Sequence, residues 1–343
     1  MLSDLSLPLA IALFAVAAAT IAVIGTRMAR IADVLADRTG LGEAMAGAIL
    51  LGATTSASGA IASITAAAGG DVDLAYANSL GGIAAQTAFL GIADIAFRKA
   101  NLEHAAASVE NITQAVMLVL MLSVPLLATM LPQVTIAGVH PASVLLIVLY
   151  VVGVRLARLD RESPMWRPRE TKETRIDVPD EDSARGPSTV MLFAGFALTV
   201  AVVGVAGWVV ARTGLVIAAR TGIGESVVGA LMTATATSLP ELVTTLAAVR
   251  RGALQMAVGG IIGGNTFDVL FLSASDIAYR DGSLYGAIDT SALFWAVVGV
   301  FMTSVLILGL IRREQHGPGN IGVESVSILA IYAGAVLAAA FAF

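Results

Sequence analysis

The sequence has no cysteine and little charge. Without cysteine, disulfides and thiolate metal sites are excluded. Asp, Glu, Lys and Arg together make up 13% of the 343 residues, about half of the share in a soluble domain. Hydrophobic residues make up 57%, and the 34 glycines suit helices that pack closely in a membrane. No phosphate-binding loop, catalytic triad or nucleic-acid-binding patch stands out. The composition therefore predicts an integral membrane protein, and no motif in the sequence indicates an enzyme.

Long apolar stretches predict an all-α membrane protein. A helix needs roughly 20 apolar residues to cross a bilayer, and ten such segments are separated by Gly, Pro or charged residues. They are residues 6–26, 42–68, 74–97, 112–131, 141–157, 188–211, 223–249, 254–278, 287–311 and 321–342. No basic region precedes the first segment, so we interpret it as a retained span and not as a cleaved signal. The small Ala, Val and Gly residues suit a prokaryotic inner membrane.

One long polar stretch, residues 155–188, separates a first transmembrane half, 1–154, from a second half, 189–343. It mixes both charge signs with proline, which favours a solvated linker, and a regulatory segment is the alternative. Basic residues concentrate in alternate loops between the predicted spans. The positive-inside rule then predicts that both termini lie outside and that the 155–188 loop lies in the cytoplasm.

The two halves contain related sequences. Residues 39–98 align without gaps with residues 221–280 at an offset of 182 positions, and about a third of the aligned residues are identical. Polar matches include Thr55 with Thr237, Ser56 with Ser238, and Asp94 with Asp276. From the order of the predicted spans, the first segment begins on the inner side of the membrane and the second begins on the outer side. We therefore expect two five-helix repeats of inverted topology, an arrangement that supports alternating access at a midplane site.

The seventh span contains an acidic residue, Glu241. An ionised carboxylate in the bilayer interior costs a few kcal/mol or more unless it is paired or hydrated, and no Lys or Arg lies in the apolar part of the spans. Thr237 shares a helical face with Glu241, and Ser238 borders that face. Pro240 is expected to kink the helix and free carbonyl oxygens near Thr237. These oxygens are ligands that hard cations prefer, although a protonated Glu241 with a structural role is the alternative.

The eighth span adds a second acid. Asn265 and Asp268 are three residues apart and share a helical face. The glycines of AVGGIIGGNTFDVL clear space for a helix or an ion to approach the backbone. Two acids in consecutive spans, each with small polar neighbours, predict a shared cation site.

The segments TSLPELVTT and AVGGIIGGNTFDVL resemble the second α-repeat of the sodium/calcium exchanger superfamily, also called cation/calcium exchangers. The resemblance implies ten helices, two inverted repeats with a cytosolic loop between them, and a first and a sixth helix that move against the rest. It implies that Glu241 is the principal carboxylate of the second repeat. Thr237 and Ser238 would supply backbone and hydroxyl oxygens, and Asp268 and Asn265 would complete that half.

The first repeat departs from the family pattern. Gly59 stands where the family has the glutamate that pairs with Glu241, and a neutral amide is paired with Asp268. The residues that the resemblance assigns to this half are Thr55, Ser56, Gln86 and Asn78. The site would thus hold at most two carboxylates. Two carboxylates neutralise one divalent ion, or alternate between protons and a cation.

These residues predict a secondary active cation antiporter that moves Ca²⁺ or another cation against Na⁺ or H⁺. The missing first-repeat carboxylate leaves a non-transporting or regulatory homologue as one alternative, and a channel-like pore is another. The expected partners are the lipid bilayer and small inorganic cations, without nucleic acid and without a covalent cofactor. The ion pair, the stoichiometry and the oligomeric state stay open.

Two further acids end their spans beside basic residues. Asp94 and Asp276 each precede an arginine, Arg98 and Arg280, by four residues. This spacing predicts interfacial ion pairs or helix caps. The three histidines lie in predicted loops, and no metal or proton role is assigned to them.

Overall fold

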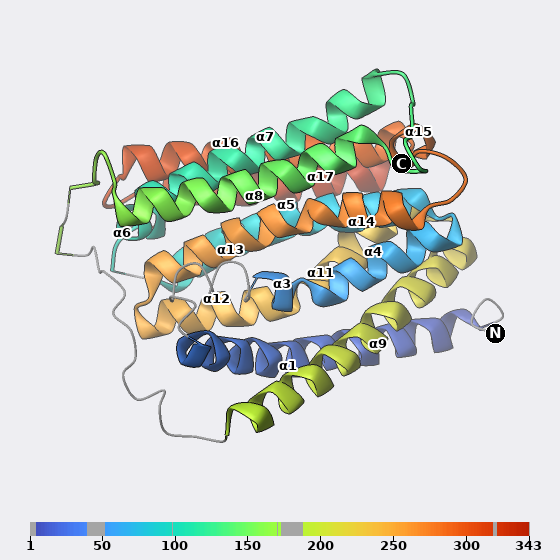
Figure 1. The fold of residues 1–343 in the computed structure, drawn as a ribbon, viewed down its shortest axis with the longest axis horizontal. Helices are drawn as coiled ribbons and strands as arrows, with labels where there is room; N and C mark the ends of the chain where they lie inside the picture. Colours follow the sequence, from blue (N-terminus) through green and yellow to red (C-terminus); the bar gives the residue numbers. More distant parts are fainter. Residues whose placement is uncertain are drawn as a thin grey trace.

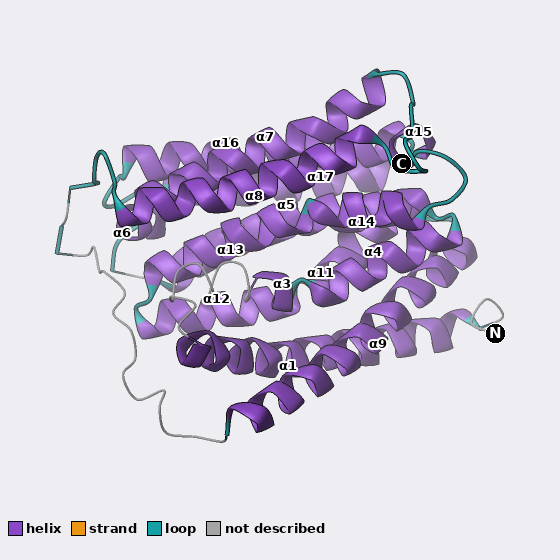
Figure 2. Cartoon of the chain, in the orientation of Figure 1, coloured by secondary structure: helices purple, strands orange, loops and turns teal. Residues whose placement is uncertain are grey.

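The computed structural model describes residues 5–39, 52–97, 99–169, 171–172, 188–317 and 321–342. Within these ranges the chain is helical and contains no strand, so the all-α prediction is confirmed (Figure 2). The helices are α1 (Leu7–Thr39), α3 (Gly52–Thr55), α4 (Ala57–Gly69), α5 (Val72–Ala96), α6 (Leu102–Ala106), α7 (Val109–Met130), α8 (Pro141–Glu162), α9 (Thr189–Thr221), α10 (Glu225–Val227), the π-helix η4 (Val228–Thr233), α11 (Ala234–Thr237), α12 (Leu239–Arg251), α13 (Leu254–Asp268), α14 (Leu270–Ala278), α15 (Leu284–Ala287), α16 (Thr290–Arg312) and α17 (Val323–Ala342).

Eight helical segments in the described ranges are long and apolar enough to cross a membrane, and the bent stretch from α10 to α12 raises the number to nine. They coincide with nine of the ten predicted spans. The remaining prediction, residues 42–68, lies partly outside the described residues, and its described part forms α3 and α4. Both α1 and α9 have 33 residues and extend well beyond the predicted ends of their spans.

The helices form three layers (Figure 1). Helices α1 and α9 pack on each other along one side of the bundle, and α7, α8, α16 and α17 form the opposite side. Between these two layers lie α4, α5 and the helices from α11 to α14. Helix α5 is 83% buried over its most apolar window, whereas α1 is 17% buried. The middle layer is therefore shielded from lipid on both sides, which is where polar side chains are tolerated.

Local sequence signals set several helix ends. Ser108 accepts a hydrogen bond from the Asn111 N–H at the start of α7, and Ser188 does the same for Met191 at the start of α9. Gly252 ends α12 with a left-handed φ of 85°. These caps satisfy backbone groups that the helix itself leaves unpaired.

Two helices of the middle layer are interrupted at equivalent positions. Ser56 separates α3 from α4, and Ser238, its aligned partner in the sequence repeat, separates α11 from α12. The axis bends by 46° at the second break, as predicted from Pro240, which lies in the first turn of α12. The breaks free the Thr237 carbonyl oxygen for a side chain, and the Ser58 hydroxyl donates to it at 3.1 Å.

The outer pair, α1 and α9, contacts the interrupted helices through glycines. A Cβ at Gly25 of α1 would lie 2.5 Å from the Pro240 ring. A Cβ at Gly207 of α9 would lie 2.5 Å from the Ser58 carbonyl oxygen. Gly25 and Gly207 are related by the same offset as the two repeat segments, and so are Ser58 and Pro240. Each glycine lets its helix approach the interrupted helix of the other half.

The prediction of an Asp276–Arg280 ion pair is wrong, and the alternative of a cap is closer to what the structure contains. Asp276 accepts hydrogen bonds from the backbone N–H of Leu284 at 2.9 Å and of His140 at 2.7 Å, and from the Ser143 hydroxyl at 2.7 Å. In the described part of the chain no ion pair joins it to Arg280. The carboxylate thus fastens the starts of α15 and α8 to the end of α14.

Asp94 has an equivalent role at the end of α5. It accepts hydrogen bonds from the N–H of Leu102 at 2.7 Å and of Gly322 at 2.8 Å. Arg98, its predicted ion-pair partner, lies outside the described residues. His104, predicted in a loop, lies in helix α6.

Candidate cation site

The candidate site lies where the interrupted helices meet in the middle layer. Its residues come from α3 and the break after it (Thr55, Ser56), from α5 (Asn78, Gln86), from the end of α11, the break after it and the first turn of α12 (Thr237, Ser238, Glu241), and from α13 (Asn265, Asp268). All nine side chains are buried, none more than 4% exposed. The helix breaks position these side chains, because each break interrupts the backbone hydrogen bonds of its helix and turns backbone and side-chain oxygens toward the site.

Gln86 joins the two halves of the chain. Its Nε2 donates to Asp268 Oδ2 at 2.6 Å and to Ser238 Oγ at 3.1 Å. The Ser56 hydroxyl lies 3.5 Å from Glu241 Oε1 and also interacts with Asp268, and Thr55 is a further hydrogen-bond partner of Glu241. The first half of the chain therefore supplies neutral donors to the two carboxylates of the second half.

The two carboxyl groups are close enough to repel each other when both are ionised. Glu241 Oε2 and Asp268 Oδ1 are buried and have no hydrogen-bond partner among the described residues. The sole ion pair found among those residues, Arg158–Glu162, lies on the exposed surface of α8. Unpaired buried carboxylates are costly, and a proton or a cation is the expected compensation for this charge.

Three neutral oxygens in the site are likewise buried without a hydrogen-bond partner among the described residues. They are the amide oxygens of Gln86, Asn78 and Asn265. Every one of these atoms is a hydrogen-bond acceptor, so water or a cation satisfies them, whereas an anion does not. In the described part of the chain no three acidic or histidine side chains come together to hold a metal ion. A cation bound here would therefore rely on amide and hydroxyl oxygens besides the two carboxylates.

Asn78 and Asn265 lie at the edge of the hydrogen-bonded network and not within it. Asn78 Nδ2 donates to the Gly59 carbonyl oxygen at 3.1 Å and to Ser63 Oγ at 2.8 Å. Asn265 Nδ2 donates to Thr87 Oγ1 at 3.0 Å. Their amide nitrogens brace α5 against α4 and α13, and only their oxygens remain for a ligand.

The space expected for a first-repeat glutamate is filled by a ring. A Cβ at Gly59 would lie 2.8 Å from Phe271 Cε2 and 3.5 Å from Thr237 Oγ1. The absence of a carboxylate is thus accompanied by aromatic packing. A longer side chain at Gly59 requires the ring to move.

Three residues that the sequence analysis did not select also support the site. Ser58 binds the Thr237 carbonyl oxygen, Ser79 donates to the Asp268 carbonyl oxygen at 2.6 Å, and Thr87 accepts from Asn265. One signal was available for Ser79, because it lies seven residues before Gln86 and therefore on the same helical face. No local pattern distinguishes Ser58 or Thr87.

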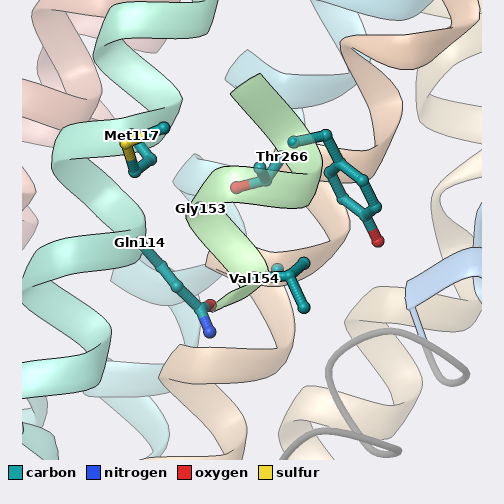
Figure 3. Close-up of a pocket in the computed structure, with 7 residues that line it drawn as sticks. Gln114, Met117, Gly153, Val154 and Thr266 are labelled. Atoms are coloured by element: carbon teal, nitrogen blue, oxygen red, sulfur yellow. The ribbon is translucent and has the colours of Figure 1, made fainter. Parts of the chain in front are cut away.

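A small cavity lies behind α13, on the side turned away from Asp268. Its volume is about 20 Å³, and its lining includes Gln114 of α7, Gly153 of α8 and Thr266 of α13 (Figure 3). Gln114 Oε1 is buried there without a partner in the described structure. The lining is mostly apolar, so the cavity is not a candidate cation site. It lies between α13 and the outer helices α7 and α8, and no acid is among its lining residues.

Fold and site together define an α-helical integral membrane protein with an acidic, oxygen-lined site in the middle of its bundle. The sequence model of the family "Sodium/calcium exchanger protein" matches residues 9–157 and 191–341. The chain belongs to this family, which is one of exchangers and not of enzymes. The resemblance seen in the second repeat is thereby confirmed.

Curated relatives match parts of the chain. The inner membrane protein YrbG of Escherichia coli is 30% identical over 150 residues, which are 44% of this chain and 43% of that protein. The putative antiporter CaxA of Alkalimonas amylolytica is 29% identical over 137 residues, which are 39% and 41% of the two chains. These matches span less than half of the relatives' lengths.

Solved structures match nearly the whole fold. The sodium-calcium exchanger NCX_Mj, soaked with Na⁺ and Sr²⁺, superposes with a TM-score of 0.62 at 17% identity and covers 97% of this chain and 99% of its own. The H⁺/Ca²⁺ exchanger CAX superposes with a TM-score of 0.70 at 13% identity and covers 96% and 82%. At these identities the likeness establishes the fold.

Proposed function

We propose that this protein is a secondary active cation antiporter, which exchanges Ca²⁺ or another hard cation for Na⁺ or H⁺ at one central site. The observation that carries the proposal is the pair of buried carboxyl oxygens, Glu241 Oε2 and Asp268 Oδ1, without a partner in the described structure. Each cation in turn would neutralise this pair, so that the two ions compete for it. Competition for one site is what antiport requires.

The donor set favours one small hard cation at a time. Carboxylate, amide and hydroxyl oxygens are ligands typical of Ca²⁺ and Na⁺, and soft ligands are missing because the chain has no cysteine. Two carboxylates balance one divalent ion, or two protons when the ion leaves. The names of the structural neighbours, a sodium-calcium and an H⁺/Ca²⁺ exchanger, agree with this ion class.

We further propose that the chain consists of two inverted five-helix repeats and that it lies in a bacterial inner membrane with both termini outside. Three features recur at the offset that relates the two repeat segments, and they support the repeat: the breaks at Ser56 and Ser238, the glycine contacts of α1 and α9, and the acids that end α5 and α14. The α1–α9 pair would move against the middle layer and expose the site to one side at a time.

A non-transporting homologue is the second candidate, and the Phe271 ring beside Gly59 favours it. The ring removes space from the first-repeat half of the site. If it also blocks the path of the ion, the site binds a cation without releasing it to the other side.

Counterflow in proteoliposomes tests the proposal. The wild type should show saturable Ca²⁺ uptake driven by an outward Na⁺ or H⁺ gradient. Glu241→Gln removes one unit charge, whose attraction to a divalent ion is worth about 8 kcal/mol at ~4 Å with an effective dielectric constant of ~20. We therefore expect Ca²⁺ affinity to fall by at least about 10³-fold. Glu110→Gln, which removes a partly buried carboxylate at the start of α7 outside the site, is the matched control and should leave uptake unchanged.

Each rival predicts a different result. Unchanged flux and pH dependence in Glu241→Gln would refute the antiport site. Single-channel steps under voltage would establish a pore. Calorimetric Ca²⁺ binding to the wild type, lost in Glu241→Gln but unaccompanied by flux, would establish the non-transporting homologue.

A further inference from the structure

A second group of buried acids lies outside the cation site, where α5 ends and α17 begins. Glu103 of α6 is 3% exposed, Asp94 is fully buried and Glu324 is 7% exposed. Asp94 accepts two backbone hydrogen bonds, from Leu102 and Gly322, one on each carboxyl oxygen. Both carboxyl oxygens of Asp94 therefore have a hydrogen-bond donor.

Glu103 is only half satisfied. Its Oε1 accepts a hydrogen bond from the Ser325 hydroxyl at 2.5 Å, whereas its Oε2 is buried without a partner in the described structure. A Cβ at Gly322 would lie 2.9 Å from Glu103 Oε2 and 3.4 Å from Asp94 Oδ2. The two acidic oxygens thus converge on the same small volume. An acceptor oxygen turned toward an anion requires a proton or a cation between them.

The surrounding charges do not supply that partner in the described structure. The charged and titratable groups around Glu103 include Asp94 of α5, Glu324 of α17, His104 of α6 and Arg313 after α16. Helix α16 also packs on α6, and its terminal Arg312 is exposed to solvent. His104 Nδ1 contacts the Arg313 carbonyl oxygen at 2.7 Å, and the Arg313 guanidinium donates to the carbonyl oxygens of His104 and Arg169. Helix α13 also packs on α6, and its one acid, Asp268, belongs to the cation site. Arg98 lies outside the described residues.

We call the cluster of Asp94, Glu103 and Ser325 an anchor, because it holds the ends of three helices together. The other half of the chain contains an equivalent anchor in which the glutamate is replaced. At the offset that aligns the two repeat segments, Asp276 replaces Asp94, Ser143 replaces Ser325, and Tyr285 stands in the position of Glu103. The Ser143 hydroxyl lies 3.1 Å from the Tyr285 hydroxyl and donates to Asp276. A phenol stays neutral at ordinary pH. Of these two anchors, the one between α5 and α17 therefore has a carboxyl group in this position, and the other has a group that does not ionise at ordinary pH.

Burial raises the pKa of Glu103 from 4.5 to about 7, the nearby charge of Asp94 adds to the increase, and the Ser325 hydroxyl opposes it. A proton fits the gap better than a metal ion, because the described residues contain no group of three acids or histidines arranged to hold a metal. Gly309 of α16 lies against both Glu103 and Glu324, with its Cβ position 3.0 Å from the Cγ of each. The space is closed by tight packing and leaves little room for a hydrated ion.

We propose that Glu103 forms a proton-binding site, separate from the cation site, that couples pH to the docking of α6 against the start of α17. The protonated carboxyl group fills the volume between Asp94 and Gly322 without adding charge. Loss of the proton places a second buried anion beside Asp94 and loosens the first turn of α17. Because α17 packs on α5, which provides Gln86 to the cation site, exchange would respond to this event.

Hydrogen exchange measured by mass spectrometry on the purified full chain tests the docking step, and it does not depend on transport. After correction for intrinsic exchange, residues 323–328 should lose protection as pH rises through about 7. The first turn of α9, which the Ser188 hydroxyl caps and which contains no acid, base or histidine, is the internal control and should keep its protection. Glu103→Gln, neutral at every pH, should hold residues 323–328 at the protection that the wild type has at low pH.

Two further measurements keep the proposal open to refutation if Glu103→Gln folds poorly. Glu103→Met, which is neutral and close to glutamate in volume, should behave in the same way. Infrared difference spectra of the wild type should contain a carboxylic-acid C=O band that disappears with a midpoint near pH 7 and is missing in both variants. The pH dependence of the exchange rate in proteoliposomes should differ between the wild type and the variants near pH 7, while the part that arises from Glu241 and Asp268 should remain in all three. A pH transition of residues 323–328 that persists in Glu103→Gln, or a wild type without one, would overturn the proposal and leave the antiport function untouched.

Discussion

The contact between Gly207 of α9 and Ser58 offers the sharpest test of the architecture. In Gly207→Ala the new methyl group would lie 2.5 Å from the Ser58 carbonyl oxygen, 3.1 Å from its Cα and 3.2 Å from its carbonyl carbon. All three atoms belong to the backbone, so no rotamer change relieves the overlap. An ordinary contact is about 3.5 Å, and therefore α9 must move by roughly 1 Å.

The change in unfolding free energy caused by Gly207→Ala is the sum of two opposing contributions. Overpacking of a close contact costs about 1–3 kcal/mol, whereas alanine is about 1 kcal/mol more favourable than glycine within a helix. Gly334→Ala on α17 isolates the second term, because a Cβ there meets nothing within 4 Å. The difference in unfolding free energy between the two variants should thus be about 1–3 kcal/mol, with Gly207→Ala the less stable.

Equilibrium unfolding in detergent, followed by counterflow in proteoliposomes, measures both consequences. Because Ser58 also binds the Thr237 carbonyl oxygen at the helix break, displacement of α9 should slow exchange as well as lower stability. A Gly207→Ala protein as stable and as active as Gly334→Ala would refute the contact, and with it the idea that α9 rests directly on the interrupted helix.

Three other predictions follow. Gln86→Leu should lower stability by about 1–3 kcal/mol at pH 8, measured by unfolding, because Asp268 loses a buried hydrogen bond; an unchanged stability would contradict the contact. Gly59→Ala should destabilise by about 1–3 kcal/mol, and Phe271→Leu should restore part of that loss in the double variant; additive effects would show that the ring is not the obstacle. Burial raises the pKa of Glu103 from 4.5 to about 7, so the protonated carboxyl group contributes stability that is complete below about pH 4.5 and is lost as pH rises to about 7. The difference in unfolding free energy between wild type and Glu103→Gln should therefore change over that pH range, and a constant difference would contradict the raised pKa.

The class of protein and the position of most spans could be predicted from the sequence alone. Apolar length is a local property, and nine of the ten predicted spans coincide with helices or with the bent pair because each span must bury its own backbone in lipid. The bend before α12 was equally predictable, since Pro240 removes a donor and blocks the preceding turn wherever it occurs. Glu241 and Asp268 were recognisable as site residues because acids are rare in such spans.

The neutral groups that contact those acids could not be predicted without the packing of the helices. Gln86 binds Asp268 across the interface between the two halves, and the Phe271 ring occupies the space beside Gly59. The same is true of Glu103, which lies between two predicted spans and carries no local pattern that would select it. Such contacts depend on how helices far apart in the chain are packed, and helical periodicity carries no information about the partner that a face will meet.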